Sequence, residues 1–237
     1  MADMIERRFF ASRAWTADGW ADNVLLVADP TGHWRQVQAS ASIADRHGAQ
    51  VLAGPALPGI VNAHSHAFQR AIAGLTERTA QGRDDFWRWR DRMYAAALRI
   101  TPHQLEAIAA FLYAELLQAG YTHVCEFHYL HNDTDGKPYA DALEMSSALV
   151  RAAQRTGIGL TLLPTLYMRS GFGAKVLRDD QRRFASTPES VMRIAHAVRK
   201  LSGGDPMLTA GVAIHSLRAV DEGALHETAQ AARAAGL

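Results

Sequence analysis

The alternation of short apolar segments with longer amphipathic ones constrains the fold of this chain most. Buried strands of an α/β protein are apolar runs, and the helices that cover them repeat apolar residues every three or four positions. Four such units follow one another, with strands expected at residues 56–63, 122–130, 159–168 and 208–217 and helices at 84–98, 102–119, 139–155, 188–201 and 221–235. This order predicts a parallel sheet covered by helices.

Cap residues support these boundaries. Thr101 followed by Pro102 is typical of a helix start, because threonine caps the free N–H groups and proline is tolerated at the first helical position. Gly120, Gly157 and Gly236 stand where helix C-caps are expected. The second part of the chain therefore has the signals of an α/β domain from local sequence alone.

The first 55 residues have a different pattern. Short β-prone pieces at residues 8–15, 24–27 and 34–37 are separated by turn formers such as Asp18-Gly19 and Asp29-Pro30. We therefore predict two domains, a small β segment at residues 1–55 and an α/β domain at residues 56–237.

The number of units leaves two architectures open. A parallel barrel of eight strands takes roughly 250 residues, whereas only four strand-helix units follow the β segment here. Alternation alone fits a four-unit doubly wound sheet as well as the first half of a (β/α)8 barrel. The choice depends on the site residues.

Composition excludes some classes of function. The formal net charge is +1, so no bulk electrostatic attraction to nucleic acid or to an anionic membrane is expected. No apolar run approaches the roughly 20 residues that span a bilayer, and residues 1–6 lack the pattern of a signal peptide. The single cysteine, Cys125, fits a reducing compartment. We therefore expect a cytoplasmic protein with neither a nucleic-acid nor a membrane partner.

A pair of histidines ends the first apolar run. His64 and His66 flank Ser65, and the two-residue period of a strand directs both imidazoles to the same side. Imidazole suits zinc, and also iron or manganese, and barrel active sites lie at the carboxyl ends of the strands. A pair of this kind is also compatible with histidines that are only hydrogen-bonded or exposed. Its position at a strand end favours a metal site.

The run Leu57-Pro58-Gly59-Ile60-Val61-Asn62-Ala63-His64-Ser65-His66 resembles the first-strand signature of the amidohydrolase superfamily. The resemblance implies an N-terminal β-sandwich segment followed by a distorted (β/α)8 TIM barrel, of which this chain holds about the first four β/α units. It therefore favours the half-barrel over the doubly wound sheet.

Further motifs look like those of the N-formimino-L-glutamate deiminases within that superfamily. They are the segments at residues 64–70, 86–90, 126–131 and 212–220, and the resemblance extends over essentially the whole chain. One departure is visible, because Ile214 precedes His215 where a proline is common in the superfamily.

The resemblance implies roles for particular residues. His64 and His66 are expected to bind zinc, and Gln69, Arg90, Tyr129, His215 and Arg218 are expected to line the substrate pocket. A substrate with two carboxylates suits arginine, whose planar guanidinium grips carboxylates. Considered without the resemblance, Arg90 equally fits a solvated salt-bridge face of a charged helix, and Tyr129 fits an aromatic residue at the rim of the sheet.

The reaction implied by the resemblance is hydrolytic deimination in histidine degradation. A metal-bound hydroxide converts N-formimino-L-glutamate to N-formyl-L-glutamate and ammonia. In the superfamily the remaining metal ligands and the general acid/base follow on later strands, so no catalytic acid or base is assigned up to Leu237. We therefore expect this chain to be the N-terminal part of a longer enzyme, inactive by itself, whose full-length form is a possible homodimer.

Two alternatives stay open at this point. One is a related deaminase of a purine or another cyclic amidine, for which fewer arginines are expected in the pocket. The other is a non-catalytic half-barrel that keeps the histidine pair without the rest of the site.

Overall fold

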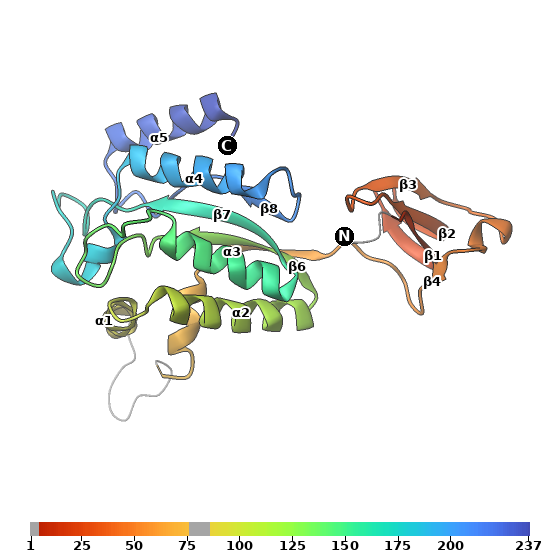
Figure 1. Cartoon of the computed structure of the whole chain (residues 1–237), viewed down its shortest axis with the longest axis horizontal. Helices are drawn as coiled ribbons and strands as arrows, with labels where there is room; N and C mark the ends of the chain where they lie inside the picture. The colour runs from red at the N-terminus through yellow and green to blue at the C-terminus, as the bar shows by residue number, and fades with distance from the viewer. Residues whose placement is uncertain (1–4, 76–85) are drawn as a thin grey trace. The chain divides into compact units, whose positions relative to one another are not determined.

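The structure is a computed structural model that describes residues 5–75 and 86–237. It divides into two compact units, Met1–Gly59 and Ile60–Leu237. Each unit has its own sheet and its own buried core (Figure 1). They are described separately below.

The first unit is a four-stranded sheet in the order β3-β2-β1-β4. Its strands are β1 (Arg7–Thr16), β2 (Gly19–Ala28), β3 (Trp34–Gln38) and β4 (Gln50–Val51), with a short 3-10 helix, η1, at Ala44–Arg46. β1 and β2 form an antiparallel hairpin, in which Gly19 takes a positive φ of 101° that suits glycine. Phe10, Leu25 and Val27 are buried on one face. The described residues supply one sheet, so the β-sandwich stays a prediction.

The second unit is a parallel sheet with helices, and this confirms the α/β class. Its strands are β5 (Ile60–Ser65), β6 (Tyr121–His128), β7 (Gly159–Leu166) and β8 (Leu208–Ala210), in the order β5-β6-β7-β8, with β9 (Ala213–Ile214) paired to β7. Every pairing within it is parallel. The arrangement is that of half a TIM barrel, as predicted.

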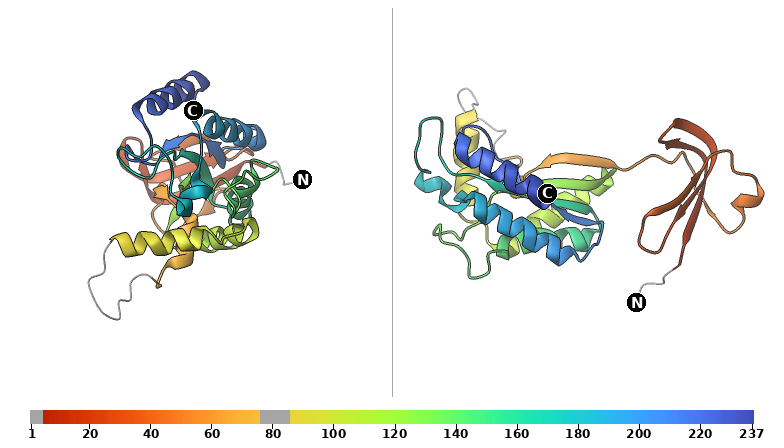
Figure 2. Two further views of the ribbon diagram at one scale, coloured as in Figure 1. Left: turned by 90° about the vertical axis from the view of Figure 1, so that its left-hand side faces the viewer. Right: turned by 90° about the horizontal axis from the view of Figure 1, so that it is seen from above.

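Five helices accompany this sheet in the part of the chain that the structure describes. They are α1 (Phe86–Ala97), α2 (Pro102–Gln118), α3 (Glu144–Thr156), α4 (Pro188–Ser202) and α5 (Glu222–Ala235), and two 3-10 helices, η2 (Ala67–Ile72) and η3 (Asp179–Phe184), lie in the connections. Figures 1 and 2 show α2, α3, α4 and α5 running alongside the strands. The main core, which includes Tyr113, Leu149 and Leu160, lies between the sheet and these helices.

The predicted caps are present. Thr101 accepts a hydrogen bond from the backbone N–H of Gln104, and the Gln104 side chain bonds back to complete a capping box. Gly157 and Gly236 end α3 and α5 in the left-handed conformation, and Gly120 follows the C-cap of α2 with φ +89°. These local signals therefore set the ends of the helices.

Three predicted boundaries were wrong. The strand expected at residues 56–63 begins at Ile60 and ends at Ser65. The helix expected from Tyr139 begins at Glu144, because Asp141 forms a turn with Leu143 and Glu144. The strand expected over residues 208–217 is split into β8 and β9 at Gly211, where a Cβ would lie 2.9 Å from Leu163. The helix expected from Asp84 is seen from Phe86, and residues 84–85 lie outside the described residues.

Within residues 5–75 and 86–237, no helix combines the length and the apolar character needed to cross a membrane.

Candidate active site

The candidate site lies where the parallel strands of the second unit end. His64 belongs to β5 and His66 follows it, Tyr129 follows β6, Tyr167 follows β7, and His215 follows β9. Because parallel strands present their carboxyl ends at one edge of the sheet, side chains distant in sequence meet there. The structure thus brings the histidine pair and several predicted substrate-binding residues into one cluster.

The two histidines form a close pair. Their Nε2 atoms are 3.0 Å apart, and the ring of His64 stacks on Phe127 with centroids 4.1 Å apart. His66 Nδ1 lies 2.9 Å from the carbonyl oxygen of Phe127 and donates to it, which leaves Nε2 with its lone pair. Burial, followed by the neighbouring charge of His64, lowers the pKa of His66 against the effect of the Phe127 bond. His66 is therefore a neutral imidazole with a fixed tautomer, and its Nε2 is available to a metal ion.

A buried carboxylate braces the turn that carries His66. Ala67 N–H donates to Glu126 Oε1 at 2.6 Å, and Tyr113 Oη donates to Glu126 Oε2 at 3.5 Å. Burial raises the pKa of Glu126 to about 7, against hydrogen bonds from Ala67, Ser65 and Tyr113. Sequence reasoning assigned Glu126 no role, since a lone glutamate in a strand gives no signal of such a partner.

The geometry of the histidine pair suits a divalent metal. Two ligands each about 2.0–2.1 Å from a tetrahedral zinc are roughly 3.3 Å apart, close to the 3.0 Å seen here. The backbone bond to Nδ1 of His66 is the outer-shell contact that orients a histidine ligand. In the described part of the chain no group of three or more His, Cys, Asp or Glu side chains is arranged for a metal. The pair therefore fits as part of a ligand set.

Tyr129 lies at the centre of the cluster. Its hydroxyl accepts a hydrogen bond from Gln69 Nε2 at 3.0 Å. Its ring contacts that of His66 at 5.0 Å and that of His215 at 5.2 Å between centroids. Burial raises the pKa of Tyr129, so the phenol stays protonated. Gln69, Tyr129 and His215, predicted as pocket residues, thus lie beside the metal-ligand pair.

His215 is held as a neutral imidazole. Its backbone N–H donates to Leu166 at 3.1 Å, and its ring packs on Tyr167 with centroids 4.2 Å apart. Burial, then the electrostatic influence of the neighbouring His66 and Arg218, lowers the pKa of His215 to about 4. Ile214, the departure from the superfamily pattern, pairs with Leu166 in β9. A neutral His215 has both a hydrogen-bond donor and an acceptor near neutral pH.

The two predicted arginines lie near Tyr167. Arg90 is on α1, with its guanidinium 5.6 Å from the ring centre of Tyr94 and 3.7 Å from a carboxylate oxygen of Asp91. Arg218 is half-buried in the connection between β9 and α5. Both guanidinium charges act on Tyr167, whose pKa is nevertheless raised by burial. The site therefore carries positive charge near Tyr167.

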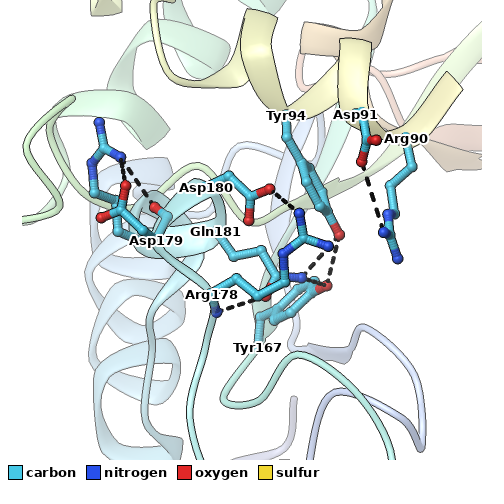
Figure 3. A network of polar contacts seen from close by, with 9 residues as sticks. Arg90, Asp91, Tyr94, Tyr167, Arg178, Asp179, Asp180 and Gln181 are labelled. Atoms are coloured by element: carbon cyan, nitrogen blue, oxygen red, sulfur yellow. Dashed lines mark hydrogen bonds and ion pairs between the residues drawn. The ribbon is translucent and has the colours of Figure 1, made fainter. Parts of the chain in front are cut away.

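A hydrogen-bonded cluster next to the arginines was missed by sequence reasoning. Gln181, in η3, donates from Nε2 to the hydroxyls of Tyr94 and Tyr167, both at 2.9 Å (Figure 3). These residues come from α1, the end of β7 and a 3-10 helix. No spacing in the sequence links them, and only the fold brings them together.

His128 and His131 do not join the site. They pack against each other with ring centroids 5.2 Å apart, and His131 Nε2 donates to the carbonyl of Thr165 at 3.1 Å. Both are buried. They belong to the packing beneath the loops.

Comparisons with known proteins agree with this arrangement. A family model described as "Amidohydrolase family" matches residues 56–237. The chain is 47% identical over 212 residues to the formimidoylglutamate deiminase of Pseudomonas aeruginosa, a match that covers 89% of this chain and 46% of that protein. The resemblance first seen in the motifs is thereby confirmed.

Solved structures give the same fold. An amidohydrolase from Brucella melitensis is 41% identical with a TM-score of 0.84, over 95% of this chain and 49% of that one. Atrazine chlorohydrolase from Arthrobacter aurescens TC1, solved with zinc, is 18% identical with a TM-score of 0.74, over 97% of this chain and 51% of that one; at this identity the likeness shows the fold alone. The chain thus spans about half the length of these relatives.

Proposed function

Because this chain belongs to the amidohydrolase family, we propose that it carries the first metal ligands and the substrate-binding residues of a formimidoylglutamate deiminase. The whole enzyme hydrolyses N-formimino-L-glutamate to N-formyl-L-glutamate and ammonia in histidine degradation. The 47% identity to a formimidoylglutamate deiminase supports this assignment over that of a purine or cyclic-amidine deaminase.

One observation carries the proposal: Tyr129 links His64 and His66 to a cluster of hydrogen-bonding and cationic side chains. The ring of Tyr129 contacts His66 on one side and His215 on the other. A metal that activates water and a group that binds the substrate must lie within one substrate length of each other. The cluster around Tyr129 brings such groups together, with residues from four strand ends.

The metal is held by His64 and His66, and zinc is the ion we propose, although iron and manganese share the preference for imidazole. When bound, such an ion supplies a nucleophile at neutral pH by lowering the pKa of water. His66 enters that role neutral, since its Nδ1–H is bonded to Phe127.

The protein's other residues bind and orient the substrate. Arg90 and Arg218 neutralise the two carboxylates through charge-assisted hydrogen bonds. Gln69, through its bond to the Tyr129 hydroxyl, fixes a phenol that donates to the ligand. His215, neutral because burial lowers its pKa to about 4, supplies a hydrogen bond without adding repulsive charge near the metal.

We further propose that these 237 residues bind the substrate without turning it over. A catalytic zinc takes about three protein ligands and an open position, and the described residues provide the His64 and His66 pair. A weak metal site and an inactive complex are the expected consequence.

The test compares ligands and activity on the purified chain supplied with zinc. N-formimino-L-glutamate is expected to bind, guanine is not, and Arg218→Met is expected to weaken the dicarboxylate about tenfold or more through loss of a charge-assisted bond. Preferential binding of guanine would favour the purine alternative. Ammonia release above that of a zinc-free control would support the substrate and contradict the proposed inactivity.

A further inference from the structure

The cluster of Tyr94, Tyr167 and Gln181 has hydrogen-bonding roles that can be assigned one by one. Gln181 Oε1 accepts from the backbone N–H of Arg178 at 3.0 Å, which fixes the amide orientation. Its two amide protons therefore face the phenols, one for each hydroxyl oxygen at 2.9 Å. Both tyrosine oxygens are thus acceptors from the same amide, as Figure 3 shows.

Because both hydroxyl oxygens accept from Gln181, each hydroxyl proton of Tyr94 and Tyr167 needs an acceptor elsewhere. The hydroxyls of Tyr94 and Tyr167 lie 3.3 Å apart, so one of them donates to the other. The second proton has no acceptor in the described part of the chain, where each hydroxyl is bonded only to the other and to Gln181. Both tyrosines are buried. A buried donor without an acceptor costs about 1–3 kcal/mol. The cluster therefore favours a ligand that accepts a hydrogen bond.

The surroundings indicate which hydroxyl keeps the spare proton and what it binds. The charges of Arg90 and Arg218 both act on Tyr167, and the ring of Tyr167 packs on His215 in the candidate site. Tyr94 lies farther along α1 beneath Arg90. A ligand that accepts a hydrogen bond in the field of two guanidinium groups is an anion, and a carboxylate offers the lone pairs for both charge and hydrogen bond.

We propose that Arg90, Tyr94, Tyr167, Gln181 and Arg218 form a carboxylate corner, in which Tyr94 donates to Tyr167 and the Tyr167 hydroxyl donates to a ligand carboxylate. Gln181 is a positioning residue, since it donates to both phenols and thereby directs their protons away from itself. The inference rests on the proposed function for the identity of the substrate, and adds the hydroxyl that selects its carboxylate.

The experiment titrates the 237-residue chain with glutarate and with N-formyl-L-glutamate, following binding by NMR and by the ultraviolet difference spectrum of tyrosine. Tyr167→Phe is expected to weaken glutarate binding about tenfold, the worth of a hydrogen bond to a charged group. Tyr121→Phe is the matched control, because Tyr121 begins β6 at the end of the strand away from the candidate site, and its affinity is expected to stay within about threefold of the unchanged chain.

The role of Gln181 is tested by substitutions that change the polarity of the side chain and keep its size similar. Gln181→Glu turns the amide donor into an acceptor that takes the spare proton and adds a negative charge, so binding is expected to fall by more than in Tyr167→Phe. Gln181→Met, which is neutral and similar in volume, is expected to lose less than Gln181→Glu. Thermal melting of each variant separates loss of binding from loss of folding.

Each outcome bears on the proposal. Selective loss in Tyr167→Phe and Gln181→Glu, with the tyrosine difference spectrum absent only from Tyr167→Phe, supports it. Equal losses in Tyr121→Phe and Tyr167→Phe, undiminished binding in Tyr167→Phe, or no glutarate binding by the unchanged chain would overturn it. Binding of glutarate without N-formyl-L-glutamate would leave the carboxylate corner standing and contradict the proposed substrate.

Discussion

The two ends of the candidate site are held in different ways. The metal end, defined by His64, His66 and Phe127, depends on one ring stack and one backbone hydrogen bond, and His64 is exposed. In the carboxylate corner, Tyr94, Tyr167 and Gln181 are buried and their side chains are bonded to one another. The proposed metal end is therefore held by few contacts within the chain, whereas the corner is held by several hydrogen bonds.

This difference separates stability from ligand binding. Disturbing the support of the carboxylate corner is expected to cost folding free energy, because its side chains are part of the core. Disturbing the metal end is expected to cost metal affinity with little effect on folding, because its side chains make few other contacts. The predictions below test this separation.

The largest effect is expected from Arg183, the buried arginine two residues after Gln181. Its guanidinium donates to the carbonyls of Asn132 at 2.8 Å, Ile100 at 2.7 Å and Ala97, tying η3 to the end of α1. Arg183→Met leaves these acceptors without their donor and is expected to cost about 3–5 kcal/mol of unfolding free energy. Urea denaturation measures it.

The matched control is Arg193→Met on α4, where the side chain is 63% exposed and pairs loosely with Glu189 at 3.9 Å. Its cost is expected to stay below about 0.5 kcal/mol. Similar losses of unfolding free energy in Arg183→Met and Arg193→Met would mean that the buried hydrogen bonds of Arg183 stabilise the fold no more than a surface ion pair does.

The next largest effect concerns pH. Burial lowers the pKa of His131 to about 4, and its Nε2–H is bonded to Thr165. The unfolded chain takes up a proton near pH 6.5 whereas the folded chain resists it, so this contribution is complete above pH 6.5 and is lost as pH falls toward 4. The loss attributable to His131 is about 3 kcal/mol, from about 1.4 kcal/mol per pKa unit.

His131→Gln keeps a donor for Thr165 and removes the titration. Its unfolding free energy, measured in urea from pH 4.5 to 7.5, is expected to fall less steeply with acid than that of the unchanged chain. Parallel pH profiles for the two proteins would show that His131 does not couple folding to protons. Acid-sensitive groups distant from His131 act equally in both and cancel in the difference, whereas His128, whose ring lies 5.2 Å away, responds to the substitution.

The third prediction concerns the metal end. His66→Ala removes one of the two close imidazoles and is expected to lower zinc affinity about 100-fold or more, since a lone histidine is a poor site. The unfolding free energy of the metal-free protein is expected to change by about 1 kcal/mol at most. Calorimetric titration with zinc and urea denaturation measure the two quantities.

His226→Ala, an exposed histidine on α5, is the control and is expected to leave zinc affinity unchanged. A large loss of stability in metal-free His66→Ala, with zinc affinity retained, would reverse the comparison between the two ends.

Much of the fold was predictable because its signals are local. The capping box at Thr101 and the left-handed cap at Gly157 depend on residues within one turn of the helix end, and the sequence shows both. The break at Gly211 was missed because it depends on a distant residue, Leu163. The start of α3 was missed because the turn at Asp141, which is local, was not recognised. Tyr139, expected in the helix, is instead bonded to Arg183 from another loop.

The site divides in the same way. His64 and His66 are two residues apart on one strand, so their proximity follows from strand geometry. Tyr94 and Gln181 are 87 positions apart in the sequence, and no pattern in either segment predicts their contact. Gln69 and Tyr129 were named through family resemblance, and the structure adds the 3.0 Å bond between them.

The smallest expected effect comes from two matched helix caps. Thr101 caps α2, which packs on η2 beside the metal end, and Thr187 caps α4, which packs on β7 leading to Tyr167. Each accepts a hydrogen bond at 3.2 Å from the backbone N–H three residues later. Thr101→Ala and Thr187→Ala are each expected to cost about 1 kcal/mol, measured by urea denaturation. Neither is expected to change zinc or glutarate affinity, because a cap acts on the helix end and leaves both ends of the site in place. If Thr187→Ala alone weakened glutarate binding, the carboxylate corner would depend on the α4 end as well as on its own hydrogen bonds.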